Sequence, residues 1–361
     1  AVGYMALKSS SADSNTAVGY MSMYTQTAGA NNNTALGYKS LYTNVTSDQN
    51  VAVGYGALES HTGGVSAPYS YATAVGYQAL NDNTDGENNT ALGYRALKLN
   101  TTGDRNIGIG DGALDAADTE NDNIAIGYNA LGGAINGGEF NVAIGNNALD
   151  SNTSGDDNIS IGYNALTSNS TGAVNVAIGK NALDANTEGG SNTAIGWNAL
   201  SANTTSNNNT AVGRQALGAS TGASNTAMGY RAGDVITTGS NNVIIGEGSD
   251  PSANNGTNQI VIGQGVTGTG NNEIALGNTS ITAIKGQVAF STYSDGRIKR
   301  QINDSKIGLD FIMKLRPVSY KMKNPADYPD EILEDRFRGD STSGPNDDGI
   351  DQRPADDETI Y

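Results

Sequence analysis

A glycine recurs along most of this sequence, and the commonest spacing between copies is 17 residues. An aliphatic residue always precedes the glycine, and a β-branched residue stands three positions before it in every complete copy. The residue between them is usually small, most often Ala. The recurring glycines are Gly3, Gly19, Gly37, Gly54, Gly76, Gly93, Gly110, Gly127, Gly145, Gly162, Gly179, Gly196, Gly213, Gly229, Gly246, Gly263 and Gly277.

Each copy predicts one short strand, because apolar residues alternate with period two and β-branched residues are enriched. An Ala-Leu pair follows the glycine, as in Ala148-Leu149, and then a polar loop such as 152–155. We therefore expect an all-β parallel solenoid, or β-roll, of about 17 stacked coils, spanning on the order of 80 Å at the spacing of β-strands. The glycines are expected at a corner, where a Cβ would clash or φ must be positive. We single out Gly127, Gly162, Gly179, Gly196 and Gly213 as such structural residues.

Composition favours a thin, repeated core over a thick globular one, since the chain has 48 glycines and only 6% aromatic residues. A single stack would leave apolar and small-residue faces exposed. Three stacks around a common axis would cover them, which predicts a homotrimer with the Ala column at the contact between chains. The alternative is a monomeric solenoid in which Ala fills a narrow core. The Thr, Val and Ile of the β-branched column are expected to face inward, which argues against ice binding.

Charge and cysteine content restrict the partners. The formal net charge is −17, distributed as −13 over residues 1–290, +5 over 291–323 and −9 over 324–361. An acidic shaft lacks the basic footprint that nucleic acid requires. No cysteine is present, and no apolar run reaches the ~18 residues that span a bilayer. We expect no nucleic-acid partner, no membrane insertion, no metal and no cofactor. The chain begins inside a repeat, so we interpret it as a fragment or processed product.

The residue after the glycine is Tyr in most of the N-terminal copies. One interpretation is an aromatic ladder on which sugar rings stack, with Tyr77, Tyr94, Tyr163 and Trp197 as the candidates. The other is a half-buried spacer that packs on the coil below, and the sequence favours this one.

The repeat Asn-Thr-Ala-Ile-Gly-Tyr-x-Ala-Leu, as at 192–200, resembles two groups of proteins. One is the parallel β-roll of trimeric autotransporter adhesin heads, and the other is the shaft of phage tail fibres. The resemblance covers residues 1–278. It implies an elongated extracellular fibre, and repeat motifs of this kind indicate architecture rather than receptor.

The periodicity changes after Gly277. Residues 279–293 are a strand-rich transition, and Ser294-Asp295-Gly296-Arg297-Ile298-Lys299 follows. With the apolar positions that come after it, this stretch resembles the start of the endosialidase-type intramolecular chaperone domain found at the end of phage tail spikes and fibres. The match covers 291–323, and we assign 294–323 to this domain. The spacing within 306–315 predicts a helix that Pro317 ends.

The chaperone resemblance implies trimerisation, assisted folding and self-cleavage. Ser294 would be the nucleophile, Lys299 its partner, and the Tyr293–Ser294 bond the one cut. Residues 324–361 depart from the family, because they form an acidic, Pro-rich tail without the later apolar helix. The resemblance therefore ends before residue 324.

These observations favour a trimeric phage tail fibre that presents a part binding a host surface glycan or protein. The second hypothesis is a bacterial trimeric adhesin or surface fibril. A third is a polysaccharide-degrading enzyme, which needs two facing carboxylates. The acids instead lie mostly in variable loops, such as Asp82 and Asp156, and His61 is expected to be solvated in an irregular loop.

Overall fold

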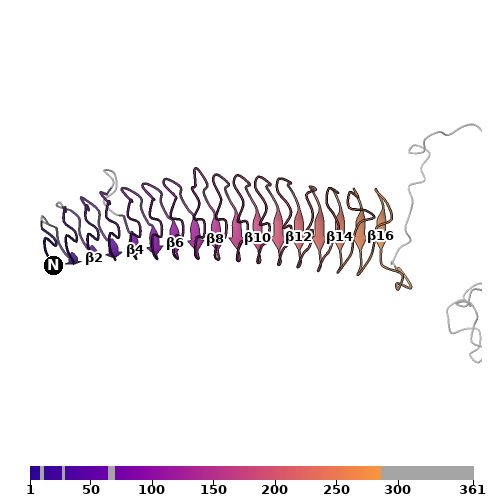
Figure 1. Cartoon of the computed structure of the whole chain (residues 1–361), viewed down its shortest axis with the longest axis horizontal. Coiled ribbons are helices and arrows are strands. Elements are labelled where there is room, and N and C mark those ends of the chain that lie inside the picture. Colours follow the sequence, from indigo (N-terminus) through magenta and orange to yellow (C-terminus); the bar gives the residue numbers. More distant parts are fainter. Residues whose placement is uncertain (9–11, 27–28, 64–69, 286–361) are drawn as a thin grey trace, which may run out of the picture. The chain divides into compact units, whose positions relative to one another are not determined.

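The computed structural model of the chain describes residues 1–8, 12–26, 29–63 and 70–285. Within these residues sixteen three-residue strands form one parallel sheet in which sequence order is spatial order (Figure 1). The expected all-β solenoid is confirmed. The strands are β1 Thr16–Val18, β2 Thr34–Leu36, β3 Val51–Val53, β4 Thr73–Val75, β5 Thr90–Leu92, β6 Ile107–Ile109, β7 Ile124–Ile126, β8 Val142–Ile144, β9 Ile159–Ile161, β10 Val176–Ile178, β11 Thr193–Ile195, β12 Thr210–Val212, β13 Thr226–Met228, β14 Val243–Ile245, β15 Ile260–Ile262 and β16 Ile274–Leu276.

The strands pair in register, so each residue lies over its equivalent in the next coil. In β10 and β11, Val176 pairs with Thr193 and Ile178 with Ile195. Val2 of the first copy adds a single parallel bridge to Val18. Ala1–Ile284 form one compact unit. A strand-rich transition was predicted for 279–293, and its described part, 279–285, contains no strand. Residues 286–361 lie outside the described residues.

The core of most coils is made by the middle strand residue and the Ala-Leu pair. In one coil Ala177, Ala182 and Leu183 are fully buried. Burial of one Leu side chain contributes roughly 2 kcal/mol, so a ladder of such side chains is the main apolar stabilisation. The expectation that the Ala column forms the contact between chains is wrong. Ala fills the interior of a coil only one side chain wide, as in the alternative weighed from the sequence.

The first and third residues of the strands point outward, which corrects the inward orientation expected for the β-branched column. Ile159 is 37% exposed, Leu92 47% and Met228 49%. Because strand side chains alternate between faces, a buried middle Ala forces both of its neighbours outward. Within such a strand the two larger side chains therefore lie on the surface and the small one inside.

Buried asparagines replace apolar side chains on the loop side of the core. Asn175 Oδ1 accepts a hydrogen bond from the Asn192 backbone N–H at 2.9 Å, and its Nδ2 donates to the Gly189 carbonyl at 2.8 Å. The same pair of bonds recurs in neighbouring coils, for example at Asn158. Each amide thus satisfies one N–H and one C=O that a narrow coil would otherwise leave buried without a partner.

The corner glycines meet both conditions expected for them. Gly196 has φ +136°, a conformation that L side chains rarely adopt. A Cβ on Gly196 would lie 2.5 Å from the Gly213 carbonyl oxygen in the next coil. The same clash recurs at Gly127, Gly162, Gly179 and Gly213, where a Cβ would lie 2.3–2.7 Å from backbone atoms of the following coil.

Further corners are made by ordinary residues in the left-handed region. In one coil these are Ser191 (φ 58°), Asn198 (φ 53°) and Leu200 (φ 52°). A non-glycine residue rarely adopts positive φ, and Leu seldom does. The stacked hydrogen bonds of the neighbouring coils hold these residues in place, as Leu200 N donates to the Ala216 carbonyl at 3.1 Å.

Candidate functional site

The corner position after each glycine carries a continuous tyrosine ladder in the N-terminal coils. Neighbouring rings stack with centroids 4.8–5.4 Å apart and interplanar angles of 5–15°. Their side chains are 39–62% exposed. We call this set the tyrosine ladder, and its members are Tyr4, Tyr20, Tyr38, Tyr55, Tyr77 and Tyr94.

Within the tyrosine ladder the rings cover one another's faces. Tyr77 lies between Tyr55 and Tyr94, with ring centroids 5.2 Å away on both sides. Arg95 lies 5.0 Å from the Tyr94 ring centroid. A sugar stacks on a free aromatic face, and Tyr77 presents its ring edge and hydroxyl instead. The spacer interpretation therefore describes the contacts of Tyr77 better than sugar stacking does.

Basic residues occupy the same corner column in the more C-terminal coils. The Lys180 ammonium lies 5.7 Å from the Tyr163 ring centroid. The Arg214 guanidinium lies 4.2 Å from the Trp197 centroid and 5.4 Å from that of Tyr230. These are cation–π contacts, so Arg214 covers one face of Trp197.

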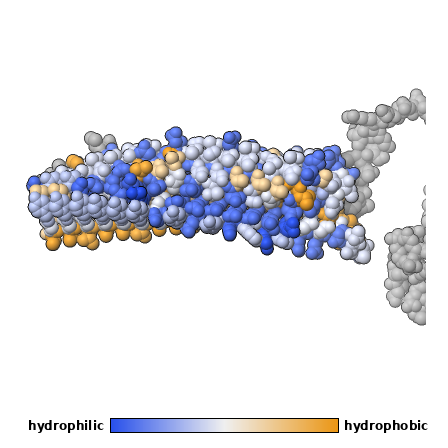
Figure 2. Space-filling view, in the orientation of Figure 1, coloured by the Kyte–Doolittle hydropathy of each residue, from blue (hydrophilic) through white to orange (hydrophobic). Residues whose placement is uncertain are grey.

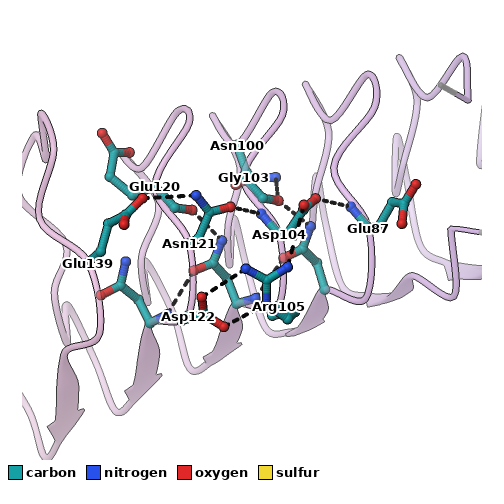
Figure 3. Close-up of polar contacts among 12 residues, drawn as sticks. Glu87, Asn100, Gly103, Asp104, Arg105, Glu120, Asn121, Asp122 and Glu139 are labelled. Atoms are coloured by element: carbon teal, nitrogen blue, oxygen red, sulfur yellow. Dashed lines mark hydrogen bonds and ion pairs between the residues drawn. The ribbon is translucent and has the colours of Figure 1, made fainter. Parts of the chain in front are cut away.

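The loop edge of the rod carries polar side chains that bond from coil to coil (Figure 3). Asp104 Oδ1 accepts from the Glu87 backbone N–H at 2.8 Å, and Asn121 Oδ1 accepts from that of Asp104 at 2.8 Å. Arg105 binds Asp122 through two N–H donors at 2.7 and 2.8 Å, and these bonds lower the pKa of the Asp122 carboxyl. These carboxylates bridge successive coils, which is a structural role.

Glu120 is a buried carboxylate on the same edge of the coils (Figure 3). Its Oε2 accepts from the Asp118 and Thr119 backbone N–H groups at 2.9 and 3.1 Å, and its Oε1 accepts from that of Gly137 at 2.9 Å. Ala117 stands in this coil where the preceding coil has the buried Asn100. The glutamate therefore supplies the acceptors that the turn requires.

His61 is fully buried, at 0% exposed, which corrects the expectation that it is solvated. It occupies the place of a core Asn, between the coils of Asn44 and Asn83. Burial lowers its pKa to about 4. The sequence did not indicate this location, because the following residues, 64–69, interrupt the repeat.

Several half-buried acids lie at one position of the coils, five residues after the corner glycine. Burial raises the pKa of Asp115, Asp150 and Asp184. The coils between them carry Gly132 and Thr167 at this position. Among the described residues no group of three His, Cys, Asp or Glu side chains is arranged to hold a metal ion.

No family model matches the chain, and no curated protein matches it. The proposals below therefore depend on the geometry of the rod and on the sequence motifs.

The candidates for self-cleavage, Ser294 and Lys299, lie outside the described residues, as do Tyr293 and the helix expected at 306–315. The described residues contain no helix with the length and hydropathy of a membrane span.

Sequence reasoning missed the outward aliphatic columns of the strands. The signal was present in the sequence, since a small residue that recurs between two larger ones marks the inner side of a narrow coil.

Proposed function

We propose that the chain is the shaft of a homotrimeric extracellular fibre, in which the outer face of the sheet packs against two further copies. The observation that carries the proposal is this uncharged face, which we call the aliphatic face because the third residue of every strand is apolar, while the first is Val, Ile or Thr. None of the first or third residues of the sixteen strands is charged, although the chain has a net charge of −17. Monomeric soluble proteins rarely expose a continuous apolar surface of such extent.

The aliphatic face runs along the sheet from β1 to β16. Figure 2 shows hydrophobic side chains gathered along the edge of the N-terminal half where the strands lie in Figure 1. Exposed members include Leu36 at 47%, Leu92 at 47% and Met228 at 49%. A cyclic trimer covers this face while all three chains keep the same direction, which a fibre with distinct ends requires. A twofold axis parallel to the rod would also keep the chains in one direction, so the resemblance to trimeric fibres is what favours three chains over two.

The oligomer is tested by the mass of the full chain in light scattering. We expect about three times the 37.0 kDa chain mass. The double variant Leu92→Lys, Met228→Lys places charges in the contact and should give a monomer with an unchanged β-sheet circular dichroism spectrum. Asn207→Lys adds a charge on the exposed loop side and should remain trimeric. A monomeric wild type would overturn the proposal.

We propose that the fibre belongs to a phage tail and spans the distance to the host surface. Two features support this: the stiff rod of stacked coils and the resemblance of 291–323 to a chaperone domain of tail fibres. Receptor binding would be multivalent, because weak sites repeated three times gain avidity. A bacterial trimeric adhesin is the alternative, favoured by the β-roll repeat, and neighbouring genes for virion structural proteins would decide between the two.

The proposed C-terminal role is assisted trimerisation followed by self-cleavage before Ser294. The intact mass of the purified chain tests it. Release of a fragment beginning at Ser294, absent in Ser294→Ala and Lys299→Ala, is the expected result. An intact wild-type chain after prolonged incubation would exclude self-cleavage by this sequence without affecting the shaft.

A further inference from the structure

The corner column contains two places where aromatic residues stand two coils apart with a short side chain between them, at Asp111 and at Asn146. At the first place Arg95 lies over the Tyr94 ring, so the second is the candidate. Tyr128 and Tyr163 are the aromatic residues, and Asn146 occupies the coil between them. Tyr128 is 51% exposed and Tyr163 is 49% exposed, somewhat more than the 42% of Tyr77 inside the tyrosine ladder.

The spacing follows from the register of the coils. Rings in adjacent coils of the tyrosine ladder lie 4.8–5.4 Å apart. Rings that skip one coil in the same column are therefore separated by roughly 10 Å, twice the spacing of stacked strands. That separation leaves space for one further ring, with a face contact on either side.

Asn146 leaves this space open because its side chain is held against the backbone. Its Oδ1 accepts a hydrogen bond from the Tyr128 backbone N–H at 3.2 Å. The Lys180 ammonium lies over the Tyr163 ring at 5.7 Å from the centroid. Lys180 belongs to the coil that follows Tyr163, so the face directed at Asn146 is the one left for a ligand.

Polar groups occupy the next corner position of the same coils. Asn147 and Asn164 directly follow Asn146 and Tyr163 in the sequence, and their half-buried amides are joined by a hydrogen bond of 3.1 Å from Asn147 Nδ2 to Asn164 Oδ1. Two aromatic faces beside a row of amides combine a surface for C–H groups with hydrogen-bonding partners for hydroxyls. This is the usual composition of a site for a polar, ring-shaped ligand.

We infer that Tyr128, Asn146 and Tyr163 form a binding slot for one pyranose ring of a surface carbohydrate. A sugar presents C–H groups on both ring faces and hydroxyls at its rim, which matches the two tyrosines and the adjacent amides. A planar aromatic ring is thinner than a pyranose and would lose close contact with one tyrosine. The geometry of the slot involves a single chain and does not depend on the trimer. Only its role in attachment to a host surface rests on the proposed function.

The other aromatic residues of the column lack such a slot. Tyr77 has rings on both sides, and Arg214 lies between Trp197 and Tyr230. Asp111 separates Tyr94 from Tyr128, and there Arg95 lies 5.0 Å from the Tyr94 centroid. The interruption at Asn146 is thus the place where aromatic faces are left uncovered on both sides.

The test is saturation-transfer NMR on the full chain with four probes: methyl glucopyranoside, methyl galactopyranoside, N-acetylglucosamine and N-acetylneuraminic acid. We expect at least one probe to bind, with an affinity on the order of millimolar because a single ring buries little surface. Tyr128→Ala and Tyr163→Ala should each weaken binding by roughly tenfold.

The decisive variant is Asn146→Tyr. It fills the slot with a third ring and continues the stack seen in the tyrosine ladder, so the fold should be at least as stable while binding is lost. Glu247→Tyr adds a tyrosine at the same position of a distant coil and should bind as the wild type does. The inference is overturned if no probe binds, or if Asn146→Tyr binds as well as the wild type. A fibre that still attaches to cells under either result would leave the proposed function standing without this slot.

Discussion

His61 Nδ1 lies 3.0 Å from Asn83 Nδ2 inside the coil, where the histidine takes the place of a core asparagine. The Asn83 amide nitrogen can only donate, so Nδ1 accepts and the proton of the neutral ring sits on Nε2. Nε2 has no hydrogen-bond partner among the described residues. The neutral imidazole is tolerated there, and a charged one is not.

This location predicts a loss of stability in mild acid. The folded pKa of His61 is lowered to about 4 from 6.5 by burial. The unfolded chain therefore binds a proton that the folded chain excludes as pH falls from about 6.5 to about 4. The stability lost across this window reaches at most ~3 kcal/mol, and below pH 4 the contribution stays constant.

The measurement is the thermal unfolding temperature of the wild type and of His61→Asn between pH 4 and pH 7. Asn occupies the equivalent position at Asn44 and Asn83, so the variant should fold. Subtracting the two curves removes the opposite contribution of acids such as Asp150, whose pKa burial raises. Equal pH dependence in both proteins would show that His61 does not carry the effect.

The buried asparagines of the core predict a large loss of stability when a single amide side chain is removed. Asn175→Ala removes the acceptor of the Asn192 N–H and the donor to the Gly189 carbonyl. Leaving these groups buried without partners should cost roughly 2–3 kcal/mol. Hydrogen exchange should show faster exchange in β10 and β11, with distant coils unchanged because each coil contacts only its neighbours.

Asn207→Ala is the matched control for this asparagine. Asn207 Oδ1 also accepts a backbone N–H, that of Gly190 at 2.6 Å, but on the exposed loop edge. Water can replace the lost acceptor there, so the change should stay below ~1 kcal/mol. A similar loss in both variants would mean that burial does not set the cost.

The corner glycines predict a severe effect of a single methyl group. Gly196→Ala combines a forbidden φ of +136° with a Cβ 2.5 Å from the Gly213 carbonyl oxygen. We expect a loss of more than ~3 kcal/mol in chemical denaturation. Gly248→Ala provides the comparison, since Gly248 has φ +59° and open space around the Cβ position, and it should lose only ~1 kcal/mol.

The backbone conformation of Val174 predicts that a substitution at this position stabilises the protein. It is 56% exposed and has φ +60°, which is unfavourable for a β-branched side chain. Asn208 has the same conformation two coils later, with φ +62°. Val174→Asn should therefore raise stability by ~1 kcal/mol, and Asn208→Val should lower it by a similar amount. A thermal shift of the same sign in both variants would contradict the assignment of strain to this position.

Much of the fold could be predicted from the sequence because the repeat records one local environment many times. The glycine column specified a corner, and the alternation before it specified a strand. The direction of the strand faces was predicted wrongly. The period of two gives the alternation of side chains without saying which side is inner. The usual rule that larger apolar residues lie inside fails for a coil in which the strand has room only for Ala177 or Ala194 beside a Leu.

The candidate site shows a similar division. The sequence identified an aromatic column and two interpretations of it, including Tyr77 and Trp197. It did not show that ring faces in the tyrosine ladder cover one another, since this depends on the coil spacing and on the shared rotamer of successive tyrosines. For the same reason Tyr128, with its neighbour Asn146, was missed.

The sequence by itself determined the repeating strand, the corner at each glycine and the stacking of one coil on the next, because these depend on backbone sterics and on a pattern repeated in register. The tertiary structure decided which face of the strand is buried, where His61 lies and which aromatic faces remain free. Those properties depend on the width of the closed coil and on the distance between coils, which no single repeat contains.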